Sequence, residues 1–180
     1  METFKLKLTS LQHEIFRLLC KNVGRPLNQS AMAKMLKVSS TAIAKAMIPM
    51  EKAGYLKIEK QGEMNLVNIR LNRTQMIMQI KRAENLKMLY ESGILAFLEE
   101  HFLGTTIILF GSYSRGDDTY TSDIDLAIIG TKEKDRDLSA FEKTLEKKVS
   151  LNFYGSFKEI HKDLMENLCN GIVLAGGITL

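Results

Sequence analysis

The chain of 180 residues has no tryptophan, two prolines and two cysteines. Two cysteines without a Cys-x-x-Cys spacing or a Cys/His grouping exclude a disulfide-rich scaffold. We therefore expect Cys20 and Cys169 to be buried, reduced thiols in a cytoplasmic protein rather than a disulfide or a zinc site. No segment approaches the roughly 20 apolar residues of a membrane-spanning helix, and the N-terminus lacks the apolar core of a signal peptide. We expect no membrane partner.

Basic and acidic residues are divided unevenly along the chain. The formal net charge is +4 at pH 7. Residues 1–73 carry 13 Lys and Arg against 5 Asp and Glu, whereas residues 74–180 carry 12 against 16. A basic segment suits a polyanionic partner, and an acidic segment with clustered aspartates suits metal ions. The two parts are therefore expected to have different partners.

Three helical patterns precede residue 54. Apolar residues recur at helical spacing over residues 11–19, and Asn28-Gln29-Ser30 opens a second helix whose Met35 is expected to face inward. A short turn follows, and then a third helix capped by Ser39 or Ser40. This order is typical of a helix-turn-helix. Pro49 is expected to kink the third helix near its C-terminal half.

Two strands, over residues 55–60 and 65–71, are predicted after these helices, joined by residues 61–64. The stretches 38–43 and 50–56 resemble the winged-helix transcription regulators, and the resemblance covers most of residues 9–71. It implies that the third helix lies in the major groove of double-stranded DNA. The implied DNA contacts are Ser40, Thr41, Ala44 and Lys45 on the helix, and Lys57, Lys60 and Arg70 on the hairpin. Protein contact and RNA binding are the alternatives.

A helical connector is predicted next, with a break at Ser92-Gly93 and a second helix from Ile94 to Phe102. Its first part contains several methionines, which suit adaptable packing between domains or subunits. Helix-turn-helix proteins commonly act as two-fold dimers. We therefore expect a homodimer.

The most informative pattern lies in the second half. Residues 106–110 predict a buried strand that ends in a Gly111-Ser112 turn, and a second strand begins near Asp123. Because side chains alternate along a strand, Asp123 and Asp125 share one face. Two adjacent carboxylates repel one another, and a divalent cation would relieve that repulsion. A Gly-Ser turn can bring backbone N–H groups and a hydroxyl close to a phosphate. Together these features predict phosphoryl-transfer chemistry.

Gly111-Ser112, ten residues and then Asp123-x-Asp125 resemble the G-S-x10-D-x-D signature of minimal nucleotidyltransferases of the DNA polymerase β-like superfamily. Residues 111–116, Gly-Ser-Tyr-Ser-Arg-Gly, are similar to its G-S-x-[AS]-R-G segment. The resemblance implies two-metal transfer of NMP from a nucleoside triphosphate with Mg²⁺. Asp123 and Asp125 would be the metal ligands and catalytic residues. Gly111, Ser112 and Arg115 would bind the phosphates.

The family's third carboxylate is missing from the expected third strand. Residues 149–154 contain no Asp or Glu, and Asn152 stands at the expected equivalent position. An amide oxygen can ligate a cation but brings no charge and cannot act as a base. The second Mg²⁺ is therefore expected to bind weakly, unless Glu142 or Glu146 substitutes. Asp117 and Asp118 are expected in a solvated turn.

The rest of the second half predicts a helix over residues 135–148 and a helix from the Ser156-x-x-Glu159 capping box to about Cys169. The chain as a whole is then α+β, with a winged helix-turn-helix over 1–72, a helical connector over 73–93 and a small mixed-sheet α/β nucleotidyltransferase-like domain over 94–180.

Two functional hypotheses follow from this architecture. The first is a DNA-binding, regulator-like protein that binds Mg-NTP and transfers NMP to a protein or small acceptor, as an antitoxin does to a toxin partner. The alternative is a winged-helix regulator whose nucleotidyltransferase-like domain is a catalytically inactive sensor or assembly domain.

Overall fold

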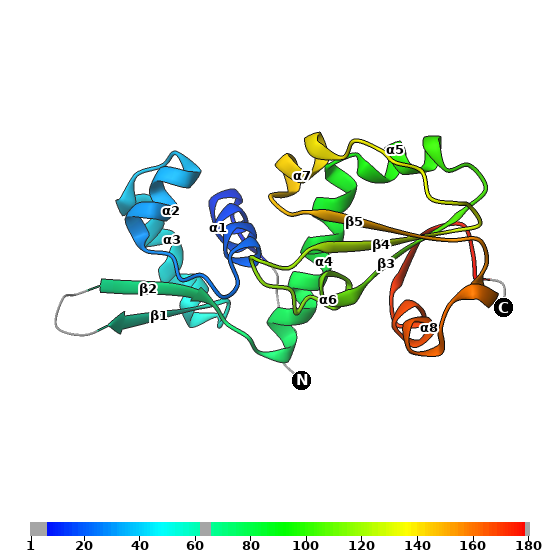
Figure 1. Cartoon of the computed structure of the whole chain (residues 1–180). Coiled ribbons are helices and arrows are strands. Elements are labelled where there is room, and N and C mark those ends of the chain that lie inside the picture. The colour runs from blue at the N-terminus through cyan, green and yellow to red at the C-terminus, as the bar shows by residue number, and fades with distance from the viewer. Residues whose placement is uncertain (1–6, 62–65, 179–180) are drawn as a thin grey trace. The chain divides into compact units, whose positions relative to one another are not determined.

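The computed structural model describes residues 7–61 and 66–178, without the side chains of residues 60, 61 and 66. The chain divides into two compact units, residues 1–77 and 78–180, and each unit has its own sheet (Figure 1). The predicted hairpin turn at residues 61–64 lies outside the described residues, apart from the backbone of Gln61.

The first unit begins with three helices: α1 (Ser10–Lys21), α2 (Gln29–Leu36) and α3 (Ser40–Lys52). The residue before each helix, Thr9, Asn28 or Ser39, accepts a hydrogen bond from a first-turn N–H through its side-chain oxygen. These caps pair donors that a helix start otherwise leaves unsatisfied. The inward faces form a core that includes Ile15, Leu19, Met32, Ile43, Met47 and Met50.

A hairpin completes the first unit. Strand β1 (Leu56–Gln61) pairs antiparallel with β2 (Leu66–Leu71), and Leu27 in the loop after α1 forms an additional bridge to Ile69. Three helices with a helix-turn-helix between the second and third, followed by a hairpin, form a winged helix. The predicted winged-helix fold of the N-terminal part is confirmed.

Two local predictions in this unit were wrong. Met35 is 47% exposed, because α2 turns only Met32 and Ala33 into the core. Pro49 does not interrupt α3, which continues to Lys52. The proline is exposed and close to the C-terminal end, so the start of the helix keeps its cap.

The second unit contains a four-stranded mixed sheet in the order β5-β4-β3-β6. β3 pairs antiparallel with β4 and β6, whereas β5 runs parallel to β4. The strands are β3 (Thr106–Phe110), β4 (Ile124–Ile129), β5 (Val149–Tyr154) and β6 (Ile172–Ala175). The helices are α4 (Gln75–Glu91), α5 (Ile94–His101), α6 (Gly111–Arg115), α7 (Ser139–Leu145) and α8 (Lys162–Cys169), with a short 3₁₀ helix at Phe157–Glu159. The predicted break between α4 and α5 is confirmed.

Alternation along the strands gives this sheet two buried faces. One face packs against α4 and α5 through residues that include Leu89, Leu98, Leu109, Leu126 and Ile128. The opposite face packs against the 3₁₀ helix and α8 through residues that include Ile108, Ala127, Ile129, Phe157 and Leu168. Figure 1 shows α5 and α8 on opposite sides of the sheet. Asp125, which alternates with Ala127, belongs to the α8 face.

Three predictions in the second unit were wrong. The helix expected over residues 135–148 covers only α7, because Asp137 Oδ1 accepts the Ser139 N–H and Glu146 turns into the left-handed region. The helix expected from Ser156 is split. Glu159 bonds back to the Gly155 N–H, and α8 starts only at Lys162. Cys169, at the end of α8, is exposed, whereas Cys20 is buried as expected.

Within residues 7–61 and 66–178, no helix is both long enough and apolar enough to cross a lipid bilayer.

Gly116 is predicted to tolerate no side chain. Its φ is +81°, and a Cβ there would lie 2.7 Å from the Met78 carbonyl oxygen on α4. Gly93 has a similar φ of +79° with nothing within 4 Å of its Cβ position. Gly93→Ala should therefore cost only backbone strain, roughly 1–2 kcal/mol, and Gly116→Ala about 1–3 kcal/mol more from the clash. Urea unfolding measures both, and equal costs would contradict the packing argument.

Candidate functional site

The two aspartates of the Asp-x-Asp motif lie where the loop after α6 enters β4. Asp123 is exposed and Asp125 is half-buried, paired with Phe110 across the strands. Gly111 follows Phe110 directly with φ of +71°, and a Cβ on it would lie 2.6 Å from Asp125 Oδ2. Only a glycine lets the turn pass beneath this carboxylate. The end of β3 and the start of β4 thus bring Gly111, Ser112, Asp123 and Asp125 together.

The electrostatics of this pair favour a bound cation. Burial raises the pKa of the Asp125 carboxyl above its ordinary value, and the negative charge of Asp123 raises it further. Both effects disfavour the ionised pair in the absence of a counter-charge. Mg²⁺ is commonly held by one or two carboxylates, with substrate phosphates and water as its other ligands. The donor set of Asp123 and Asp125 fits one such ion.

Ser112 and Arg115 lie in α6, the short helix that begins at the Gly-Ser turn. Ser112 is half-buried beside Gly111 in the chain. Arg115 is exposed, and its Nε donates to Asp117 Oδ2 at 3.2 Å. The arginine is therefore engaged by its own loop, and reaching a phosphate would require this ion pair to open.

The register of β5 changes the position of the missing carboxylate. Asp125 pairs with Ser150, whereas Asn152 pairs with Ala127 two residues further along. Paired residues of parallel strands point to the same face, so Ser150 and not Asn152 lies beside Asp125.

The glutamates suggested as substitutes do not complete the site. Glu142 accepts a hydrogen bond from the Val149 N–H at 2.9 Å, so its carboxylate is used to hold the start of β5. In the described part of the chain, no three His, Cys, Asp or Glu side chains gather in a metal-binding group. The site therefore offers two carboxylates for one cation and no third for another.

Asp118 was expected in a solvated turn, and this prediction was wrong. Its side chain is fully buried, with ion pairs to Lys81 and to Lys147, whose Nζ lies 3.4 Å from Asp118 Oδ2. Asn85 Nδ2 also donates to Asp118 Oδ1 at 2.7 Å. A buried carboxylate between two buried lysines satisfies part of the desolvation cost of all three charges. The loop before Asp123 is thus anchored in the interior.

Lys147 ties this anchor to the aspartate pair. It follows α7, and its Nζ donates to the carbonyl oxygens of Thr119 at 2.5 Å and Ser122 at 3.2 Å. Burial lowers the pKa of the Lys147 ammonium, while the carboxylates of Asp118 and Asp123 act in the opposite direction. Ser122 immediately precedes Asp123, so Lys147 holds the backbone from which Asp123 projects.

Helix α4 supplies the other side of the anchor. Asn85 donates to the Tyr113 carbonyl oxygen at 3.0 Å, and the Tyr113 hydroxyl donates back to the Asn85 carbonyl oxygen at 3.2 Å. Lys81 and Asn85 are four residues apart and both buried. Polar residues at helical spacing on an otherwise apolar face were the signal in the sequence that could have revealed this contact.

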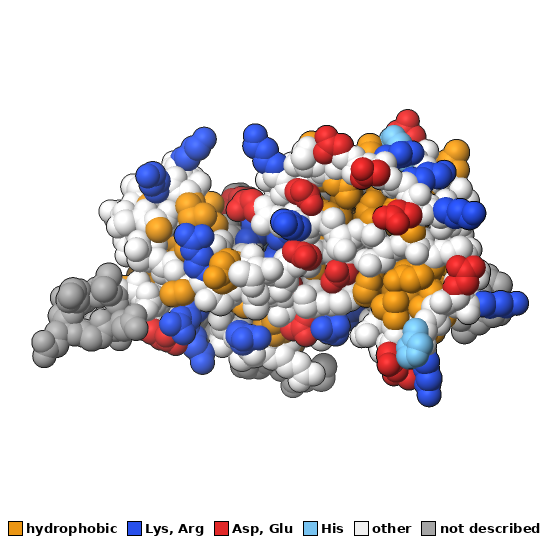
Figure 2. All heavy atoms as spheres, viewed as in Figure 1, with side chains coloured by type: hydrophobic (Ala, Val, Ile, Leu, Met, Phe, Trp, Pro, Cys, Tyr) orange, Lys and Arg blue, Asp and Glu red, His pale blue; other side chains and the backbone are white. Residues whose placement is uncertain are grey.

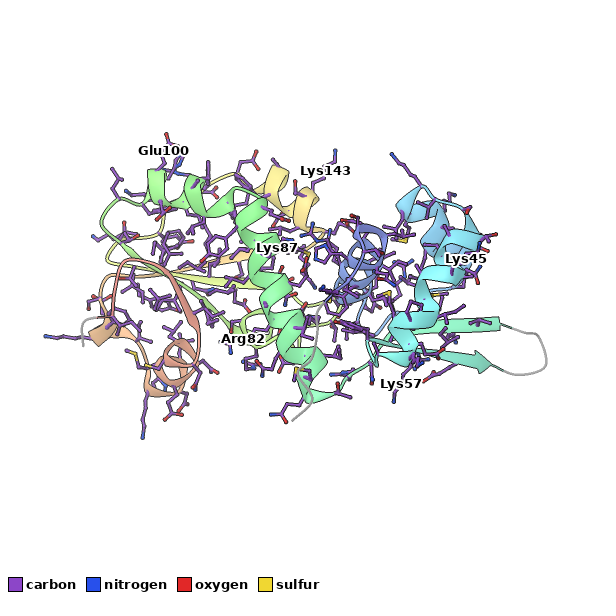
Figure 3. The ribbon with its side chains drawn as sticks, turned by 180° about the vertical axis from the view of Figure 1, so that it is seen from behind. Lys45, Lys57, Arg82, Lys87, Glu100 and Lys143 are labelled. Carbon is purple, nitrogen blue, oxygen red and sulfur yellow. The ribbon has the colours of Figure 1, made fainter. Side chains whose placement is uncertain are left out.

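The residues predicted to contact DNA on α3 are exposed at its N-terminal end. Ser40, Thr41 and Lys45 are exposed and Ala44 is half-buried. Figure 3 labels Lys45 on this helix. Ile48, one turn beyond Lys45 and Ala44, is 66% exposed. Sequence reasoning did not single it out, because an isoleucine in a helical pattern is usually counted as core.

The residues predicted on the hairpin are divided. Lys57 and Arg70 are exposed and lie opposite one another in the register. Arg70 Nη1 is 3.5 Å from Glu59 Oε2, so part of its charge is offset. The side chain of Lys60 lies outside the described residues. The hairpin therefore contributes less free positive charge than its composition predicted.

Residues 91–173 match a family model described as the nucleotidyltransferase domain. This match contains the Gly-Ser turn, the Asp-x-Asp pair and β5. The second unit carries a nucleotidyltransferase domain. The match begins at the last residue of α4, so Lys81 and Asn85 precede it, whereas Asp118 and Lys147 lie within the nucleotidyltransferase domain.

Among curated proteins, none matched this chain. Solved structures gave weak similarities to bacterial regulators. Mutant structures of Lactococcus lactis ZitR have 21% identity, a TM-score of 0.43 and cover 57% of this chain and 66% of that chain. The crystal structure of an S. aureus MepR–DNA complex has 17% identity, a TM-score of 0.40 and cover of 52% and 77%. This chain thus spans about two thirds of the length of ZitR. The winged-helix assignment rests on the observed elements and their pairing.

Asp125→Asn is predicted to stabilise the cation-free protein. Because folding raises the Asp125 pKa, ionisation of this group costs stability as pH rises through the raised pKa, and the cost is fully present at pH 7. The amide removes it. The difference in melting temperature between variant and wild type should be positive at pH 7 and shrink as the pH falls. A variant less stable than wild type at pH 7 would contradict the assigned repulsion.

Proposed function

We propose that this chain is a DNA-binding regulator whose nucleotidyltransferase domain binds a nucleoside triphosphate together with one Mg²⁺. The observation that carries the nucleotide part is the half-buried Asp125 carboxylate lying directly over Gly111, beside the like charge of Asp123. Repelling carboxylates next to a turn that admits only glycine form a place where a cation and a phosphate chain can meet.

The side chains then have separate tasks. Asp123 and Asp125 hold the cation, and Gly111 and Ser112 bring backbone N–H groups and a hydroxyl to the phosphates. Arg115 contributes charge to the phosphates once it releases Asp117. When bound, Mg²⁺ neutralises phosphate charge and orients the triphosphate.

Transfer of NMP to a protein or small acceptor is the second candidate function, favoured by the intact Gly-Ser and Asp-x-Asp elements. Two-metal transfer needs a further ligand for the second ion and a group that activates the attacking nucleophile. Ser150 and Asn152, on β5, supply neither a negative charge nor a base. We therefore expect nucleotide binding to be readily measurable and transfer to be slow. The antitoxin-like role, with a toxin as acceptor, and the homodimer stay predictions.

Nucleotide binding is tested by calorimetric titration of the full chain with each NTP in the presence of Mg²⁺. Wild type should bind, and Asp123→Asn and Asp125→Asn should abolish binding because each removes a cation ligand. Asp163→Asn, an exposed aspartate on α8, is the matched control and should bind as wild type does. Binding that survives both motif substitutions would refute the proposed site. Labelled NTP with cell lysate then reports any transfer.

The DNA-binding part rests on α3 and on the charge of its unit. Thr41 and Lys45 are one turn apart on the exposed side, at the end of the helix that enters the major groove in winged-helix proteins. Residues 1–73 carry the basic excess of the chain. Short side chains at the tip carry little base code, so phosphate contacts supply most of the affinity.

Lys45→Ala is predicted to weaken binding to a duplex from the region upstream of the protein's own gene. Loss of one phosphate contact should reduce the slope of log affinity against log salt by about one. Lys87→Ala, an exposed lysine on α4 in the second unit (Figure 3), removes the same charge and should have no effect. Fluorescence anisotropy over a salt series measures both. Salt-insensitive binding, or equal effects of the two substitutions, would count against the proposed DNA-binding surface.

A further inference from the structure

The loop between α6 and β4 is held from inside the second unit by a lysine. Lys147 Nζ donates to the carbonyl oxygens of Thr119 and Ser122 and lies 3.4 Å from Asp118 Oδ2. Its side chain is 3% exposed. The loop is closed on its other side by Ser122, whose Oγ accepts the Thr119 N–H at 3.0 Å. A single buried ammonium therefore fixes both ends of the turn that precedes Asp123.

Lys81 offers an internal comparison. It is also fully buried and pairs with the same carboxylate, Asp118, from the opposite side. Its described contacts reach no carbonyl of the 119–122 turn. Two lysines thus share one carboxylate, but only Lys147 is bonded to the turn that carries Asp123.

We propose that Lys147 is a positioning residue for the cation site, because it holds the turn from which Asp123 projects. The proposal rests on the proposed function, since it assumes a cation at Asp123 and Asp125. It adds a residue outside the Gly-Ser and Asp-x-Asp motif, supplied by the segment after α7, on which that site depends.

Two effects of Lys147 on a bound cation oppose each other. Its positive charge repels the ion, but the Asp118 carboxylate lies against it and offsets much of this charge. Its hydrogen bonds to two carbonyl oxygens fix the direction of Asp123, and removing it leaves these oxygens without that donor. We expect the loss of positioning to outweigh the loss of repulsion, so that removing Lys147 weakens cation binding. Loss of a group that orients a ligand typically costs about 10–100-fold in metal affinity.

The test is Mn²⁺ binding by the full chain, measured from the electron paramagnetic resonance signal of free Mn²⁺ at a temperature where each variant is folded. Lys147→Met should lower the affinity by about tenfold or more. Lys81→Met is the matched control: it also removes a buried lysine from Asp118, but it should leave the affinity near that of wild type. Equal losses in the two variants, or tighter binding by Lys147→Met, would overturn the proposal.

A milder pair keeps the test decisive if Lys147→Met does not fold. Ser122→Ala removes the hydroxyl that accepts the Thr119 N–H and should also weaken Mn²⁺ binding. Thr121→Ala removes an exposed hydroxyl whose described contact is with Thr119 Oγ1, and should not. No difference between these two variants would show that the turn does not position Asp123.

The proposed function and this inference fail in different ways. If wild type does not bind Mn²⁺, or if Asp123→Asn and Asp125→Asn bind as wild type does, the cation site itself is refuted and the positioning role with it. If the aspartate variants lose binding while Lys147→Met and Ser122→Ala do not, the cation site stands and only the role of Lys147 is refuted.

Discussion

The second unit depends on one buried carboxylate. Asp118 lies between Lys81, from α4, and Lys147, from the segment after α7, so three elements distant in the sequence meet at one side chain. Removing either lysine leaves part of a buried charge uncompensated, which is far more costly than losing an exposed ion pair. The short α6, its following loop and the start of β4 take their positions from this contact. The Gly-Ser turn and the Asp pair lie at the two ends of the segment that it holds.

The two buried faces of the sheet explain where chemistry is possible. Leu126 and Ile128 fill one side of β4, and Ala127 and Ile129 fill the other, so the strand is closed to water over most of its length. Only its first residues, next to the loop after α6, can present carboxylates. Acidic and basic side chains are spread over the face of the molecule shown in Figure 2, but exposed charges of that kind are well solvated. The half-buried Asp125 differs because burial makes its charge costly until a counter-ion binds.

The winged helix and the nucleotidyltransferase domain use charge in contrasting ways. On α3 the basic side chains stay in water, where they can exchange counter-ions for phosphates. In the second unit two lysines are buried and spent on holding a loop, so they add nothing to a surface field. The basic excess of residues 1–73 is therefore available to a polyanion, whereas the charges around Asp118 serve the internal order of the domain.

Local patterns were predictable from the sequence. The caps Thr9, Asn28 and Ser39, the alternation along β4 and the Gly-Ser and Asp-x-Asp spacing depend on neighbours within a few residues, and the structure keeps all of them. Long-range packing decided the rest. Asp118 is buried because α4 and the segment after α7 bring lysines to it, and Ser150 rather than Asn152 stands beside Asp125 because strand pairing sets the register. Burial and register depend on residues far apart in the chain, so only the tertiary structure could determine them.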